Sequence, residues 1–179
     1  LKWKKSRSIS GQLKVIGSFS KPMMVNFFEF KAAGLSTEGR IEFDTEGLNR
    51  VLLSDFQVSN WLSAEVTLVN QGSGVPMQIL VSDGVLDLRK FPQTKSRSLV
   101  VVGPAAPLIV KLQSLQISDS LALKNVAAEF KDGLIAGGLF SGKVNGGTSI
   151  SGILVGSGDN LRLNLVSQDA GGALRDAGL

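Results

Sequence analysis

The sequence of 179 residues contains neither cysteine nor histidine. Without cysteine the chain forms no disulfide framework and no thiolate zinc site. Without histidine it has no Ser-His-Asp or Cys-His catalytic centre, and most catalytic zinc sites are excluded as well. An enzyme built on this chain has to work with carboxylates, lysine or serine alone. We therefore expect a protein that is not an enzyme and that holds no metal or cofactor.

Charge and long apolar segments are also scarce. Charged residues make up 19% of the chain, against roughly 25% in an ordinary soluble domain. The uncharged stretch Leu99–Val110 is too short to span a membrane and carries Pro104 and Pro107. The opening residues have no apolar core of a signal peptide, and the chain begins without methionine, so we expect a fragment of a longer protein. Hydrophobic residues still reach 43%, so a large apolar surface has to be placed within the fold.

The net charge of +4 is concentrated near the N-terminus, where six of the 19 basic residues precede the first acid, Glu29. The cluster is either a solvated basic face or a surface for anionic lipid headgroups. No nucleic-acid-binding motif accompanies it, so nucleic acid is not expected as a partner. The candidates for headgroup contact are Lys2, Lys4, Lys5 and Arg7.

Alternation of apolar and polar residues predicts strands along most of the chain. It is clearest in Leu161–Leu165 and recurs in Thr37–Phe43, and it places every second side chain on one face. In Leu121–Phe130 the alternation changes phase, which a β-bulge near Asn125 explains. Further strands are expected at residues 13–15, 52–58, 66–69, 77–81 and 108–112, while residues 48–53 fit a strand or a turn of helix.

Turn residues predict hairpins in the C-terminal third. Asn145-Gly146-Gly147, Ser157–Asn160 and Asp132-Gly133 each separate two short strands. The last residues predict a short helix that Asp169 caps, with Leu174 and Leu179 available for packing. The expected fold is therefore all-β with a minor C-terminal helix.

A weak internal repeat suggests how these strands are organised. Phe56–Leu62 aligns with Leu115–Leu121, although chance similarity between hairpins explains the match equally well. We expect a first β-repeat over residues 1–90, a connection over 91–107 and a second β-repeat over 108–179, or else one continuous domain. Pro104 and Pro107 argue against a central strand in the connection.

Residues that could carry chemistry have simpler structural explanations. Asp83 and Asp87 flank Gly84 and Val85, but Asp83-Gly84 fits a turn or bulge and Asp87 alternates as a solvent-facing residue. Asp169 is better explained as a helix cap than as a metal ligand. The pairs Gly137-Gly138 and Gly146-Gly147 precede no helix and no GK[ST] motif follows them, so they form no phosphate-binding loop. No catalytic, cofactor-binding or metal-binding set emerges.

The remaining feature is the apolar face itself. Such a face either packs against a second sheet, as in a sandwich or closed barrel, or lines a groove that meets acyl chains. Alternation alone leaves both alternatives open, because each needs one dry face.

Two motifs resemble the AsmA-like family of TamB/YhdP type. Val85-Leu-Asp-Leu-Arg89, after Asp83-Gly84, resembles the "lDlr" step of that family. Ser167-Gln-Asp-Ala-Gly171 followed by Leu174-Arg175 is similar to the "s-x-D-a-G-x-x-L-r" signature of its C-terminal region. The resemblance extends over most of the chain.

The resemblance implies a fold, a function and a location. The fold is an antiparallel, twisted, repetitive β-sheet that forms a groove or open β-roll with an apolar inner face. The function is binding or conduction of phospholipid acyl chains and support of outer-membrane homeostasis, in the periplasmic portion of an inner-membrane-anchored protein of a Gram-negative bacterium, with envelope proteins as further partners. The alternatives are a structural or adhesin-like β-domain that binds proteins through its sheet edges and, with less support, a glycan-directed enzyme that uses carboxylates. The candidate groove residues are Ile41, Phe43, Leu161, Leu163 and Leu165.

Overall fold

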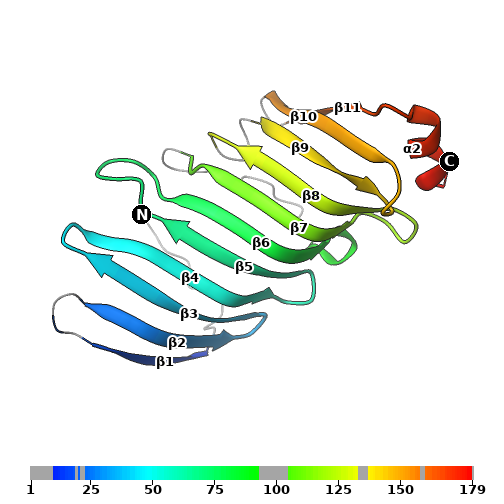
Figure 1. Cartoon of the computed structure of the whole chain (residues 1–179). Coiled ribbons are helices and arrows are strands. Elements are labelled where there is room, and N and C mark those ends of the chain that lie inside the picture. Colours follow the sequence, from blue (N-terminus) through cyan, green and yellow to red (C-terminus); the bar gives the residue numbers. More distant parts are fainter. Residues whose placement is uncertain are drawn as a thin grey trace, which may run out of the picture.

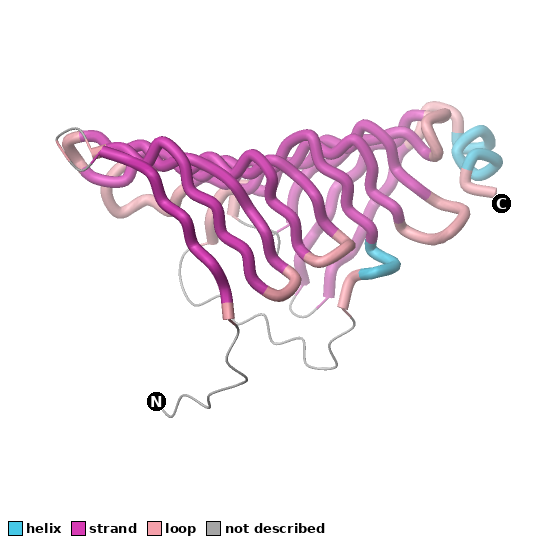
Figure 2. Tube along the Cα trace, turned by 90° about the horizontal axis from the view of Figure 1, so that it is seen from below, coloured by secondary structure: helices cyan, strands magenta, loops and turns pink. Residues whose placement is uncertain are grey.

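The computed structural model describes residues 10–18, 20, 23–92, 105–132, 137–157 and 160–178, and for residues 156, 157, 160 and 161 it describes the backbone alone. In these ranges the chain forms one sheet of eleven strands that lie side by side in sequence order (Figure 1). The sheet is open and strongly bent (Figure 2). The strands are β1 (Gly11–Ser18), β2 (Met24–Ala32), β3 (Leu35–Asp44), β4 (Gly47–Val58), β5 (Leu62–Val69), β6 (Gln78–Asp87), β7 (Leu108–Gln116), β8 (Ala122–Phe130), β9 (Gly137–Val144), β10 (Ser149–Ser157) and β11 (Asn160–Val166).

The expected all-β class with a short C-terminal helix is confirmed, with one difference in strand direction. All neighbouring strands are antiparallel except β6 and β7, which run parallel. A parallel pair cannot be joined by a hairpin. The chain therefore returns, after β6 ends, to the side of the sheet on which the first residue of β6 lies, and β7 begins there. Residues 93–104 of this connection, including Pro104, lie outside the described residues. Pro107 precedes β7 directly, and its carbonyl oxygen accepts a hydrogen bond from Ile79 N at 2.8 Å.

Tight turns follow the turn residues of the sequence. Asn145 and Gly146 both have positive φ, 47° and 86°, as a two-residue hairpin turn between twisted strands requires. This confirms the hairpin that joins β9 and β10. The hairpins predicted at Asp132-Gly133 and Ser157–Asn160 do join neighbouring antiparallel strands, although Gly133, Gly158 and Asp159 lie outside the described residues.

The bulge predicted near Asn125 is confirmed. Asn125 has a φ of 50°, and the pairing of β8 with β9 shifts between Lys124 and Ala127. The extra residue restores the phase, so that Leu123 and Val126 lie on the same face of the sheet. Asp83 forms a corresponding bulge in β6, with a φ of 50°, as the Asp83-Gly84 pattern predicts.

The predicted C-terminal helix is α2 (Ala170–Asp176), and Asp169 caps it. An oxygen of the Asp169 carboxylate accepts a hydrogen bond from Gly172 N at 2.7 Å. The helix packs through Ala173 and Ala177 rather than through Leu174, which is 54% exposed. The short alanine side chains allow close approach to the sheet, whereas the Leu174 side chain is largely exposed to solvent. Leu179 lies outside the described residues.

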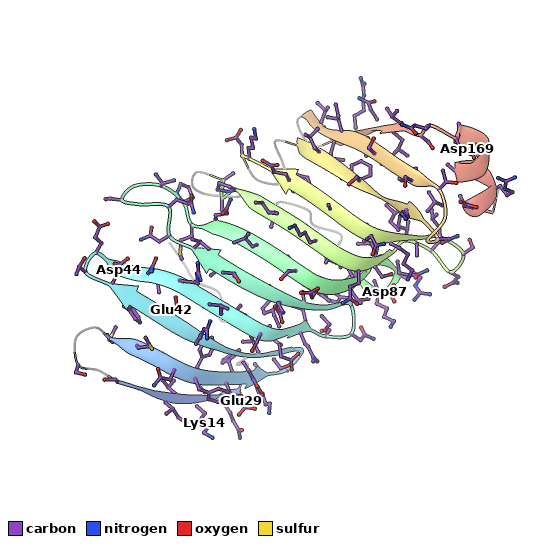
Figure 3. The ribbon with its side chains drawn as sticks, viewed as in Figure 1. Lys14, Glu29, Glu42, Asp44, Asp87 and Asp169 are labelled. Carbon is purple, nitrogen blue, oxygen red and sulfur yellow. The ribbon has the colours of Figure 1, made fainter. Side chains whose placement is uncertain are left out.

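Asp87 is not the solvent-facing residue that alternation predicts. It lies at the end of β6 (Figure 3) and opposite in phase to Leu86, but it is buried. Its carboxylate is held by Arg89 and, at 3.4 Å, by the Lys90 ammonium. Arg89 donates to both carboxylate oxygens of Asp87, at 2.8 and 2.7 Å. Asp87 also caps the short 3-10 helix η1 (Leu88–Lys90), which directly follows β6. The side chains that follow β6 therefore fold back over Asp87 and cover it.

The candidate functional site is an apolar inner face

Cross-strand pairing assigns the paired side chains to one of two faces. Directly opposed residues of neighbouring strands point to the same side of a sheet, so pairs can be followed from strand to strand. One such row runs through Val51, Leu68 and Ile79 and continues to Leu108 and Phe130. We call the side that contains this row the inner face and the other side the outer face.

The inner face carries no charged residue at any paired position of the described strands. Its single polar side chain at such positions is Thr37, whose hydroxyl donates to the carbonyl oxygen of Glu38 at 3.3 Å. The bulges maintain this composition, because each one absorbs a residue that would otherwise bring polar side chains to this side. Further members of the face include Phe28, Leu35, Leu53, Leu62, Val81, Leu86, Val110, Leu115, Phe140, Ile150 and Leu154.

Nearly all buried hydrophobic side chains lie on the inner face. The exception is Ala122, which pairs with Gln116 on the outer side. The largest cluster consists of Leu112, Leu123, Val126 and Val144, with Ala173 and Ala177 of α2 against one corner. Among the described elements, no second sheet lies over this face, and each strand packs mainly against the strands beside it in the sheet. The side chains of neighbouring strands on this face therefore shield one another.

Several aromatic rings pack flat against the inner face instead of projecting from it. A Cβ placed on Gly152 would lie 2.6 Å from Cε1 of Phe140, its direct neighbour on β9. A Cβ on Gly39 would lie 3.0 Å from Cε1 of Phe28 in the same way. The atom closest to such a Cβ is a backbone oxygen of the neighbouring strand, that of Asn164 for Gly152 and that of Leu52 for Gly39. Glycine thus leaves space for this backbone as well as for the ring.

The inner face is long as well as apolar. Strands in a sheet are spaced by about 4.8 Å, so ten spacings between eleven strands give a length of about 48 Å. One leaflet of a bilayer core is about 15 Å thick. The face is therefore about three times as long as one acyl chain in a membrane.

All groove candidates with a described face lie on this side, but at two distant places. Ile41 and Phe43 lie on β3, half-buried. Leu163 and Leu165 lie on β11 and are 50% and 56% exposed. The backbone pairing of Leu161 with Gly156 assigns it to the same side, although its side chain lies outside the description. The headgroup candidates Lys2, Lys4, Lys5 and Arg7 lie outside the described residues.

The sequence-based candidates omit most of the face. The strands between β3 and β11 contribute the bulk of it, including Val144, its most buried residue. The same alternation of apolar and polar residues predicts them, provided that it is continued in the opposite phase after each bulge. Phe28 and Phe30, two residues apart, show this alternation and are predicted by it to share one face.

Both ends of the inner face are open. β1 and β11 each have one neighbour within the described sheet. Leu13 on β1 is 65% exposed, comparable to Leu165 on β11. An edge strand presents unpaired backbone groups and leaves one flank of its side chains uncovered, so the apolar surface continues to both edges.

The titratable groups whose pKa values are shifted belong to structural contacts. Hydrogen bonds from Arg89 hold the pKa of the Asp87 carboxyl well below its usual range. Hydrogen bonds from Thr148 lower the pKa of Asp176, first from the Thr148 side chain and then from Thr148 N, which lies 2.6 Å from an Asp176 carboxylate oxygen. Asp87 holds η1 at the end of β6, and Asp176 holds α2 against Thr148, the residue before β10. Within the described ranges, no three acidic residues come together as a metal site, and no helix combines the length and apolar character needed to cross a membrane.

Comparisons with family models, with curated proteins and with solved structures found no match to this chain.

Proposed function

We propose that the inner face is a trough that binds the acyl chains of phospholipids and lets them move along the sheet. The observation that carries this proposal is the uncharged inner face, which continues across all eleven strands without a second layer among the described elements. An apolar surface of this size ordinarily marks a ligand or partner. The AsmA-like resemblance points to the same use.

The proposed mechanism is passive. Each CH₂ group that leaves water is stabilised by about 0.8 kcal/mol. A chain that slides from one strand to the next exchanges equivalent apolar contacts, because the inner face keeps its composition from β1 to β11. The open side of the trough leaves a charged headgroup in water, where it pays no desolvation penalty. No catalytic group takes part, so the proposal does not assign an enzyme activity.

The proposed setting follows from the resemblance alone. The chain would be a periplasmic segment of an inner-membrane-anchored AsmA-like protein of a Gram-negative bacterium, with a role in outer-membrane homeostasis. Envelope proteins are possible further partners in that setting.

A photo-cross-linking experiment tests the trough directly. Benzoylphenylalanine would replace Ile41 or Leu163 on the inner face, and Arg40 or Glu42 on the outer face of β3 as matched controls. After illumination with phospholipid vesicles, mass spectrometry should find lipid adducts at the two inner positions and not at the outer ones. Equal labelling of both faces, or none at the inner positions, would refute the proposal.

The alternative of protein binding through the sheet edges rests on β1 and β11. Both strands have one unoccupied side among the described residues, and an extended segment of another protein can add to such an edge. The same experiment separates the two functions, because edge binding predicts protein cross-links near β1 or β11 and no lipid adduct at Ile41.

A further inference from the structure

The outer face changes character between the two halves of the sheet. On β1–β5 the acids Glu29, Glu38, Glu42 and Glu65 alternate with Lys14, Lys31, Arg40 and Arg50. Lys31 forms an ion pair with Glu29, and Arg40 with Glu42 at 3.5 Å. Figure 3 labels Lys14, Glu29 and Glu42 in this half. Opposite charges on neighbouring positions largely neutralise this part of the surface.

On β7–β11 the outer face is cationic. Paired outer positions of these strands carry Lys111, Lys124, Lys143 and Arg162 and a single acid, Glu129. Lys124 and Lys143 lie directly opposite each other on β8 and β9. Like charges in that arrangement destabilise a sheet. The Lys124 ammonium donates to the Ser114 hydroxyl at 2.8 Å, and no acid among the described residues forms an ion pair with either lysine.

Exposed aliphatic side chains lie beside these lysines. Leu139 on β9 faces Ile153 on β10, and the two are 59% and 49% exposed. Val155 follows on β10 and is 43% exposed. Between the lysines and this aliphatic group lie the small residues Ala127, Ser141 and Ser151, directly paired in one row. Lys111 lies in the same row as Ala127, and Arg162 lies directly opposite Val155. Basic and exposed aliphatic side chains are therefore close neighbours on this surface, with the acid Glu129 opposite Leu139.

We propose that the outer face of β7–β11 docks on the surface of an anionic lipid bilayer. Lysine stems run along apolar surface and carry their ammonium groups to lipid phosphates, while the aliphatic side chains enter the boundary with the acyl region. Each basic residue near an anionic membrane adds to the attraction. The absence of aromatic side chains at paired outer positions of β7–β11 disfavours single-stranded nucleic acid, which stacks its bases on such groups. This surface lies opposite the proposed trough, so it does not depend on what the trough holds.

Vesicle flotation with the full chain tests the proposal. The probes are vesicles of phosphatidylcholine alone and of phosphatidylcholine with phosphatidylglycerol. The test variant is K111Q/K124Q/K143Q. The matched control is K14Q/K31Q/R50Q, which removes the same charge from the outer face of the other half. A third variant, K2Q/K4Q/K5Q/R7Q, separates this surface from the basic N-terminus.

The unmodified chain should float with the anionic vesicles and not with the neutral ones. The test variant should lose binding by about tenfold or more, whereas the matched control and the N-terminal variant should stay within about threefold. L139S/I153S should weaken binding without any change of charge. Should the triple variant fail to fold, which circular dichroism reports, Lys143→Gln alone gives the comparison with Lys14→Gln.

Three results would overturn the proposal. The first is absence of binding to anionic vesicles. The second is an equal loss of vesicle binding in the test variant and its matched control, because binding would then depend on net charge and not on this surface. The third is complete loss in the N-terminal variant, which would assign binding to Lys2, Lys4, Lys5 and Arg7.

Discussion

Phe140 lies over Gly152 on the neighbouring strand. The two residues are directly paired, and a Cβ on Gly152 would lie 2.8 Å from Cζ of the ring and closer still to Cε1. Glycine usually weakens a strand, but here it provides the space in which the ring lies flat. The packing of the inner face therefore depends on pairs of residues on different strands.

Replacement of Gly152 by alanine should destabilise the protein by about 1–3 kcal/mol, because the methyl group meets both the backbone oxygen of Asn164 and the Phe140 ring. Urea unfolding followed by circular dichroism measures the change. Ser151→Ala on the outer side of the same strand is the control and should stay within about 0.5 kcal/mol. Phe140→Leu in the G152A background should recover part of the loss. A neutral or stabilising G152A would contradict the packing described for this pair.

Asn125 should tolerate glycine and reject a β-branched residue. Its φ of 50° lies in the left-handed region, which costs about 1–2 kcal/mol for an ordinary L-residue. Asn125→Val should lower the free energy of unfolding by at least that amount, while Asn125→Gly should stay close to the wild type. Thermal and urea unfolding of both variants measure the difference. Equal effects would mean that the bulge is not needed to hold Leu123 and Val126 on one face.

The stability contribution of Asp87 should depend on pH with a defined sign. The contacts with Arg89 lower the pKa of Asp87 in the folded protein, whereas aspartate in an unfolded chain has a pKa of about 3.9. Its stabilising effect is therefore complete above that value and is lost as the pH falls below it. Asp87→Asn should be less stable than the wild type at pH 7, and the difference should narrow on acidification to pH 3.

Urea unfolding of both proteins across that pH range makes the comparison. Asp119→Asn serves as its control, because Asp119 also contacts Arg89, at 2.7 Å, but its side chain is 96% exposed. Exposed ion pairs contribute little, so D119N should track the wild type at every pH. A constant gap between D87N and the wild type would show that the loss is unrelated to protonation.

Replacing a leucine of the inner face by alanine should lower the free energy of unfolding in proportion to the burial of its side chain. Leu112 is 6% exposed and belongs to the main cluster, whereas Leu165 is 56% exposed on the edge strand. Leu112→Ala should cost about 2–4 kcal/mol and Leu165→Ala less than about 1 kcal/mol. Similar losses at both positions, measured by urea unfolding, would indicate that something covers the β11 end of the face in solution.

The sequence was sufficient for the features that depend on local pattern. Alternation in Leu161–Leu165 predicts a strand with one apolar side, the phase change around Asn125 predicts a bulge, and Asp169 predicts a helix cap. Each of these features is confirmed by the structure. They are readable because a period of two residues, a turn and a cap each involve only a few neighbouring residues.

Only the tertiary structure decided how those strands combine. The parallel pairing of β6 with β7, the burial of Asp87 under Arg89, the Phe140–Gly152 contact and the opposed Lys124 and Lys143 all join residues whose partners are set by strand order and register. Alternation also left open whether the apolar side packs against a second sheet. In the described part of the chain it does not, because the strands pair edge to edge in one continuous sheet. A period of two fixes which side of a strand is apolar, but the choice of neighbour, and therefore what covers that side, depends on contacts between distant segments.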